Sequence, residues 1–228
     1  MFWYIFIFYV VVILLMILLM NFLMKIKKFE NFDEETRALY INLDDRKDRK
    51  DQIEKELNEK NIKYERFSAV KNENGALGCS KSHLNVIKLA KERNYDQVII
   101  FEDDFEFIVN KDEYNEEMNK LNNVNFDVCL LSYNTQNFYP SEYDFLYKIK
   151  DALTCSGYIV NSHYYDRLIS CWEESVEMFE KTGDIKYTSD LSWLKLQEND
   201  NWVCFKKRLG KQRASYSNIQ KHQVDYNV

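Results

Sequence analysis

The segment 97–101 (QVIIF) constrains the fold most, because it is an apolar run of strand length that ends directly in three carboxylates. A strand that faces water on one side alternates apolar and polar side chains, so a continuous run indicates a strand buried on both faces. Such strands occur mainly in parallel sheets that helices cover on both sides. The run therefore predicts an α/β fold.

Similar runs alternate with helical patterns along the rest of the chain. Further strands are expected at 38–43, 62–70, 126–132 and 152–160. Helices are expected at 44–60, after a glycine-containing turn at 75–78, and at 162–181, where Gly183 follows as the stop signal. This alternation predicts a mostly parallel sheet covered by helices, with ligands bound beyond the carboxyl ends of its strands.

The charged segment 44–60 reads as an amphipathic helix. Ile53 and Leu57 are four residues apart and supply its inward face. The lysine, arginine and acidic side chains between them form a solvated face that needs no functional explanation.

Three consecutive carboxylates, Glu102, Asp103 and Asp104, follow the central apolar run. They repel one another near a core unless a cation or hydrogen-bond donors neutralise them. Side chains alternate along a strand, so Glu102 and Asp104 are expected to share a face while Asp103 points away. Two hard oxygen ligands on one face suit Mg²⁺ or Mn²⁺. The alternative is that all three carboxylates are solvated in a loop or cap a following helix.

Several catalytic motifs are missing from the sequence. It has no GxxxxGK[ST] loop, no GxGxxG and no GxSxG, which excludes the P-loop, dinucleotide-binding and serine-hydrolase classes. Phe105 and Glu106 follow the carboxylates where a haloacid-type phosphatase has a different pattern. Chemistry at neutral pH must therefore come from carboxylates, metal or histidine.

The C-terminal tail carries a histidine and a local group of cations. His222 is expected either to fold over a site and reach a metal or to lie in a disordered terminus. The cations would attract a diphosphate. They are Lys206, Lys207, Arg208, Lys211 and Arg213.

The first 24 residues carry no charge and precede Lys25, Lys27 and Lys28. About 20 apolar residues in a helix span the ~30 Å of a bilayer's hydrocarbon core. The absence of a basic start and of a small-residue cleavage site argues against a cleaved signal peptide. We therefore expect a single-pass transmembrane anchor at 1–24, a linker at 25–37 and one domain at 38–228. The lysines favour a domain that faces the cytoplasm, with a luminal domain as the alternative.

Charge and cysteines exclude other classes. The chain has 31 basic and 37 acidic residues, a net charge of −6, so nucleic acid is not an expected partner. Its five cysteines are scattered without CxxC spacing, so their spacing indicates neither a zinc site nor a disulfide framework. They are expected to be mostly buried free thiols.

Three segments follow one another in chain order: YINLDDR at 40–46, GCSKSHL at 78–84 and IIFEDD at 99–104. Together they resemble glycosyltransferase family 25, which includes lipopolysaccharide-type and procollagen galactosyltransferases. The family's pattern is a strand ending in INLD-R, a GC-x-x-SHL helix start and a hydrophobic strand ending in EDD. The later segments SGYIV at 156–160 and DLSWL at 190–194 also resemble the family, and the resemblance covers 39–217.

The resemblance implies a GT-A-like, Rossmann-related fold, a UDP-galactose or UDP-glucose donor, Mn²⁺ (or Mg²⁺), and inversion at the anomeric carbon. Asp104, with Glu102 behind it, is expected to hold the metal that bridges the donor diphosphate. Asp103 is expected to position the donor or bond its ribose. Inversion needs a carboxylate that takes the acceptor's proton, and Asp190 is expected to be that base or an acceptor contact.

The other expected site residues surround the nucleotide. Asn42 and Asp44 lie at the end of the first strand, where the resemblance places the nucleotide. Ser82 and His83 are expected to border the same pocket. His83 is also expected as a packed or capped side chain, because a histidine on a helix more often has that role.

The sequence therefore favours a membrane-anchored, metal-dependent glycosyltransferase that moves a hexose from UDP to a glycan, a lipid-linked sugar or a hydroxylated protein side chain. One alternative is a catalytically silent scaffold that binds a nucleotide-sugar or glycan at a membrane. A third hypothesis, metal-dependent phosphoester hydrolysis, explains Glu102 and Asp104 but not the INLD and SHL segments.

Overall fold

The computed structural model describes residues 3, 12–21, 37–217 and 222–224. The chain divides into two units, 1–36 and 37–228, and each is described by itself. In the first unit, 12–21 is helical and its apolar side chains are mostly exposed. The rest of the expected anchor and most of the expected linker lie outside the described residues. No helix among the residues that are described has both the length and the apolar character to cross a membrane.

The second unit is built on a large mixed sheet, mostly parallel. Within the described residues it has eight strands in the order β2-β1-β3-β8-β5-β9-β7-β6. β8 runs antiparallel to both of its neighbours, and so does β7. The strands are β1 (Arg37–Asn42), β2 (Tyr64–Ser68), β3 (Gln97–Glu102), β5 (Val128–Leu130), β6 (Tyr139–Pro140), β7 (Leu146–Lys148), β8 (Gly157–Asn161) and β9 (Trp202–Phe205).

Helices connect these strands, and two small antiparallel sheets complete the unit. The helices are α2 (Lys47–Glu59), α3 (Gly75–Glu92), α4 (Lys111–Leu121), α5 (Tyr165–Thr182), α6 (Ser189–Ser192) and α7 (Leu194–Gln197), with 3-10 turns η1 (Ser162–Tyr164) and η2 (Ile185–Tyr187). The small sheets pair β4 (Phe105–Phe107) with β10 (Gly210–Gln212), and β11 (Ser215–Ser217) with β12 (His222–Val224).

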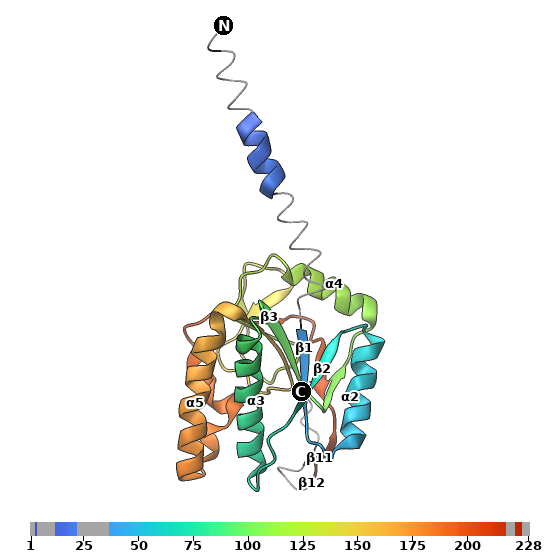
Figure 1. Cartoon of the computed structure of the whole chain (residues 1–228), viewed down its shortest axis with the longest axis vertical. Coiled ribbons are helices and arrows are strands. Elements are labelled where there is room, and N and C mark those ends of the chain that lie inside the picture. Colours follow the sequence, from blue (N-terminus) through green and yellow to red (C-terminus); the bar gives the residue numbers. More distant parts are fainter. Residues whose placement is uncertain (1–2, 4–11, 22–36, 218–221, 225–228) are drawn as a thin grey trace. The chain divides into compact units, whose positions relative to one another are not determined.

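The large sheet lies between two helical layers. On one face, Leu39 of β1 joins the main hydrophobic core with Ile87 of α3 and Trp172 of α5, and Figure 1 shows these two helices side by side. On the other face, Tyr40 donates a hydrogen bond to Glu54 of α2. Because neighbouring side chains of a strand point to opposite faces, β1 contributes to both layers. The expected α/β class with a mostly parallel sheet is therefore confirmed.

The start of α3 differs from the expected glycine turn. The helix already begins at Gly75, and the side chain of Asn74 caps it by accepting a hydrogen bond from the backbone N–H of Leu77. Gly78 lies inside the first turns, where a Cβ atom would stand only 2.6 Å from the carbonyl oxygen of Val70. Glycine therefore serves here to let the loop after β2 pass close to the helix, not to make a turn.

Candidate active site

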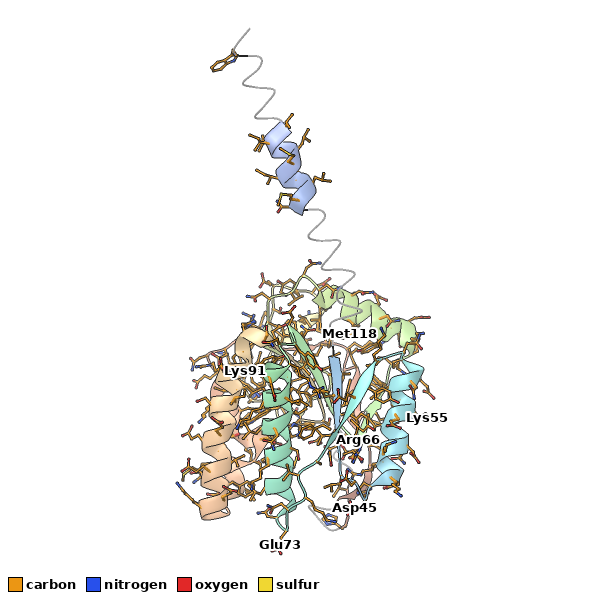
Figure 2. The ribbon with its side chains drawn as sticks, in the orientation of Figure 1. Asp45, Lys55, Arg66, Glu73, Lys91 and Met118 are labelled. Atoms are coloured by element: carbon orange, nitrogen blue, oxygen red, sulfur yellow. The ribbon has the colours of Figure 1, made fainter. Side chains whose placement is uncertain are left out.

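A cavity of about 290 Å³ opens at the carboxyl ends of β1 and β3. Residues from widely separated segments line it. They include Asn42 at the end of β1, Arg49 of α2, Cys79 of α3 and Gln212 of β10. Figure 2 shows Asp45 and Glu73, two further lining residues, at the same end of the domain. This is the sheet edge where ligands of parallel α/β folds bind.

Asp103 and Asp104 face a common cation within this cavity. The Arg49 Nη1 atom lies 2.9 Å from Asp103 Oδ1 and 3.0 Å from Asp104 Oδ2. The expectation that Asp103 points away from Asp104 is therefore wrong. Its physical reason is that β3 ends at Glu102 and the two aspartates form a turn, so strand alternation does not extend to them. The solvated face expected at 44–60 is also wrong at Arg49, whose side chain is 12% exposed.

Asn42 holds Asp103 in place. The Asn42 Nδ2 atom donates to Asp103 Oδ2 over 2.7 Å and also to the carbonyl oxygen of Arg46. The Oδ1 atom of Asn42 accepts from Arg66 Nε over 3.0 Å, which fixes the orientation of the amide. Burial raises the pKa of Asp103 above its usual range, although Arg49 and Asn42 oppose the shift.

Asp104 is a buried carboxylate whose negative charge is only partly balanced by hydrogen-bond donors and cations. It is 6% exposed, and its Oδ1 atom is buried without a hydrogen-bond partner. Its Oδ2 atom accepts from Arg49 and, over 3.2 Å, from Gln212 Nε2. Burial and the charge of Glu102 raise the pKa of Asp104 to about 7. An unpartnered carboxylate oxygen beside excess negative charge fits a bound cation with oxygen ligands.

Glu102 points to a different set of partners. Its Oε1 atom lies 2.8 Å from His83 Nε2 and 3.5 Å from Cys79 Sγ. Burial alone would raise the pKa of Glu102, but the hydrogen bond and the charge of His83 lower it overall. The His83 Nδ1 atom lies 2.8 Å from the Tyr158 hydroxyl. His83 does not line the cavity and is fully buried, so it meets the site only through Glu102.

Ser82 borders the cavity but its hydroxyl is used within the fold. The Ser82 Oγ atom donates to the carbonyl oxygen of Gly78 and accepts from the backbone N–H of Val70. Both bonds fasten the loop after β2 to α3, and the side chain is fully buried.

Three other predicted site residues are not among those that line the cavity. Asp44 is exposed and accepts hydrogen bonds from Arg66 and Ser68. Asp190 lies in the first turn of α6 and accepts a hydrogen bond from Thr188 Oγ1. It lies near enough to Cys79 for its charge to contribute to the raised pKa of that thiol. His222 is exposed on β12, and the site's own contact with this strand is Val224.

The cationic group expected in the tail does not form one surface. Lys207 pairs with Glu113, and Lys206 lies over the ring of Tyr147. Arg208 lies over the ring of Tyr133. Arg213 donates its backbone N–H to the backbone carbonyl oxygen of Asp104, and its side chain pairs with Glu56. The cations are dispersed because Lys206, Lys207 and Arg208 lie between β9 and β10, whereas Lys211 lies in β10 and Arg213 follows it.

Sequence reasoning missed Arg49 and Gln212, which both contact Asp104. Arg49 stands in a segment crowded with exposed charges, so its residue type carried no signal. The three carboxylates predicted a neighbouring cation, and Arg49 is one such cation.

The unit has an α/β fold that resembles the fold of a solved glycosyltransferase. The crystal structure of a glycosyltransferase involved in the glycosylation of the major capsid of PBCV-1 matches with a TM-score of 0.53 at 8% identity, over 78% of this chain and 92% of that chain. The crystal structure of mannose-1-phosphate geranyltransferase from Thermus thermophilus matches with a TM-score of 0.45 at 7% identity, over 78% and 74%. At such identities the likeness is one of fold.

A family model matches the central segment of the sequence. Residues 73–179 match the model of glycosyltransferase family 25 (LPS biosynthesis protein). This confirms the resemblance based on the motifs, and the matched segment contains GCSKSHL and IIFEDD. The YINLDDR and DLSWL segments lie outside it. No curated protein matches the chain.

Proposed function

We propose that this chain is a metal-dependent, inverting glycosyltransferase of the GT-A-like fold. It moves galactose or glucose from a UDP-sugar to a glycan, a lipid-linked sugar or a hydroxylated protein side chain. The observation that carries this proposal is the cavity at the ends of β1 and β3, into which Asp103 and Asp104 project beside the unpartnered Oδ1 atom of Asp104. The match to family 25 supports the transfer of a sugar.

Asp104 is the residue that would hold Mn²⁺ or Mg²⁺, with Glu102 behind it and His222 as a further ligand from the tail, and Asp103 would position the donor or bond its ribose. Carboxylate oxygens suit both ions, and the donor's phosphates complete the shell. When bound, the ion neutralises the charge that develops on the departing UDP. Arg49 pairs with both aspartates. It would therefore also be able to bind a donor phosphate beside the ion.

The remaining residues hold the donor and prepare the acceptor. Asn42 keeps Asp103 oriented toward the nucleotide, and Asp44 stands beyond it at the end of β1. Ser82 and His83 support the wall of the cavity from α3. Asp190 takes the proton of the acceptor hydroxyl. The acceptor oxygen forms a bond to the anomeric carbon while the bond from that carbon to the phosphate oxygen of UDP breaks.

The test is UDP release from UDP-galactose and UDP-glucose by the full chain in detergent, with and without Mn²⁺. We expect slow, Mn²⁺-dependent release even without an acceptor, and its loss in Asp104→Asn. Asp166→Asn is the matched control, because Asp166 is an exposed aspartate on α5 outside the cavity. The control retains the release of the parent protein.

The other outcomes separate the alternatives. Release of inorganic phosphate instead of UDP would replace transfer with phosphoester hydrolysis. Mn²⁺-dependent UDP binding without release of UDP from either sugar, even when candidate acceptors are added, would favour a binding scaffold. Absence of both binding and release would overturn the assignment of the cavity.

We also propose that residues 1–24 anchor the chain in a membrane with the domain in the cytoplasm. The support is the uncharged run and the lysines that follow it. In membrane fractions, the full chain resists carbonate extraction and a chain that begins at Lys25 does not. Protease added to sealed, right-side-out vesicles leaves a cytoplasmic domain intact, whereas digestion of the domain would reverse the orientation.

A further inference from the structure

A thiol, an imidazole and a carboxylate converge on one point behind the aspartate pair. Cys79 and His83 are four residues apart on α3, so their side chains lie on the same face of the helix. Glu102 reaches them from the end of β3, and its Oε1 atom lies 3.5 Å from Cys79 Sγ and 2.8 Å from His83 Nε2. The three ligand atoms all lie within 4.8 Å of one another. Atoms this close together can bind one small metal ion after small side-chain movements.

The surroundings fix the imidazole for such a role. His83 is fully buried, and its ring contacts the rings of Tyr158 and Trp172. The Tyr158 hydroxyl lies 2.8 Å from the Nδ1 atom, which leaves Nε2 directed at Glu102 and Cys79. Metal-binding histidines commonly have a second hydrogen-bonded group of this kind, which sets the tautomer and the ring orientation.

We propose that Cys79 Sγ, His83 Nε2 and Glu102 Oε1 form a binding site for Zn²⁺. A thiolate and an imidazole favour Zn²⁺ over Mg²⁺ or Mn²⁺, and three protein ligands leave the fourth position open. Cys79 and Glu102 both line the cavity, so the open position faces it and is available to water or to an oxygen of a bound ligand. The CxxC spacing that is missing from the sequence is replaced by a helical i, i+4 pair and a carboxylate from a neighbouring strand.

The charges near this point also favour a cation. Glu102, Asp103 and Asp104 are consecutive, and Arg49 donates hydrogen bonds to both aspartates. Zn²⁺ replaces the Cys79 thiol proton, which leaves to solvent. It also requires an unprotonated Nε2, with the remaining imidazole proton on Nδ1, where it is donated to the Tyr158 hydroxyl oxygen. The proposed Zn²⁺ ligands include neither Asp103 nor Asp104, and the site does not depend on sugar transfer.

The experiment titrates the metal-free full chain with Co²⁺, which reports thiolate coordination by absorption. We expect a near-ultraviolet thiolate-to-cobalt charge-transfer band and the visible bands of tetrahedral cobalt, both of which saturate at one Co²⁺ per thiolate site and are displaced by Zn²⁺. Cys79→Ser and His83→Gln each remove the charge-transfer band or shift the binding beyond detection. Cys129→Ser, at a buried cysteine on β5, keeps it.

Second variants keep the proposal falsifiable if Cys79→Ser or His83→Gln unfolds, which circular dichroism would reveal. Tyr158→Phe keeps the ring and loses only the hydroxyl, and we expect Zn²⁺ affinity to fall by about 10–100-fold. Asp104→Asn keeps the Co²⁺ band, even though it loses Mn²⁺-dependent UDP release under the proposed function. A band that survives in folded Cys79→Ser, or no band in the parent protein, would overturn the zinc site and leave the proposed transfer untouched.

Discussion

At the scale of single residues, the site depends on one guanidinium. Arg49 contacts both Asp103 and Asp104, and its side chain is 12% exposed. Two buried carboxylates that share one cation keep an excess of negative charge, which is costly in a medium of low polarity. In the protein without bound metal, Arg49 therefore stabilises the turn that presents both aspartates.

Replacing Arg49 by glutamine should destabilise the metal-free protein strongly. The substitution leaves two buried carboxylates without their cation, and the cost of breaking such a pair is about 3 kcal/mol. Urea unfolding in EDTA measures the loss, and added Mn²⁺ should restore part of it because a second cation then faces the same oxygens.

The control for this substitution is Arg167→Gln. Arg167 also pairs with an aspartate, Asp200, but its side chain is 53% exposed. Exposed pairs contribute less than about 1 kcal/mol, so this variant should unfold close to the parent protein. If both variants lost the same free energy of unfolding, burial of the Arg49 pair would not increase its contribution to stability.

The buried carboxyl of Asp104 should make stability depend on pH. Its pKa is about 7 in the folded protein against 3.8 as the ordinary value. Between these values the folded state binds more protons than the unfolded state, so the free energy of unfolding falls as pH rises from about 4 to 7. Asp104→Asn in EDTA should remove this fall and equal or exceed the parent in stability at pH 8.

Unfolding curves of both proteins at several pH values measure the effect. The difference between their free energies of unfolding changes between pH 4 and 7 by up to about 1.4 kcal/mol for each pH unit. The difference between the parent protein and Asp166→Asn should not change with pH. A difference for Asp104→Asn that does not vary with pH would contradict the raised pKa.

At the scale of elements, the site depends on how closely α3 approaches the loop after β2. Gly78→Ala places a methyl group where the carbonyl oxygen of Val70 already stands, at 2.6 Å. Because backbone must move, we expect a loss of about 1–3 kcal/mol, together with weaker metal binding at Cys79 on the same turn. Thermal unfolding and Co²⁺ titration measure the two effects.

Gly183→Ala is the matched control for this substitution. Gly183 ends α5 with φ +66°, and nothing lies within 4 Å of its missing Cβ. The expected loss is about 1 kcal/mol from the left-handed backbone alone, with metal binding intact. If Gly78→Ala cost no more than this, the close approach would not matter.

Helices and strands with a long, regular pattern of apolar residues could be predicted from the sequence, and those with a short pattern could not. The strand at 97–101 and the helix at 162–181 are present as β3 and as η1 with α5, because each has a strong periodicity and a clear end. The structure adds α4, β9 and β10, whose patterns are short or mostly polar. The antiparallel direction of β8 also carries no local signal, because it is set by its partners β3 and β5.

The same distinction applies to the candidate site. The three carboxylates were predictable because charge at the end of a buried strand is anomalous. Their partners were not, because Arg49 and Gln212 come from 55 residues before and 108 residues after Asp104. The turn at Asp103 and Asp104 likewise depends on tertiary contacts, which strand alternation does not describe.

At the scale of the whole molecule, the cavity joins the two ends of the domain. Asn42 follows the first strand, Gln212 and Val224 come from the tail, and the carboxylates lie between them in the chain. A ligand in the cavity contacts all of these segments only in the folded state. Its binding free energy is therefore added to the stability of the entire domain.

UDP and Mn²⁺ together should raise the unfolding temperature of the full chain more than either alone. At a ligand concentration 100 times the dissociation constant the gain is about 2.7 kcal/mol. Asp104→Asn should lose the gain that requires both ligands, while Asp166→Asn keeps it. Differential scanning calorimetry across a range of UDP concentrations measures the shift, which must increase with the logarithm of the concentration. A shift with Mn²⁺ alone that UDP does not increase would mean that the cavity binds cations without the nucleotide, and the donor assignment would then be wrong.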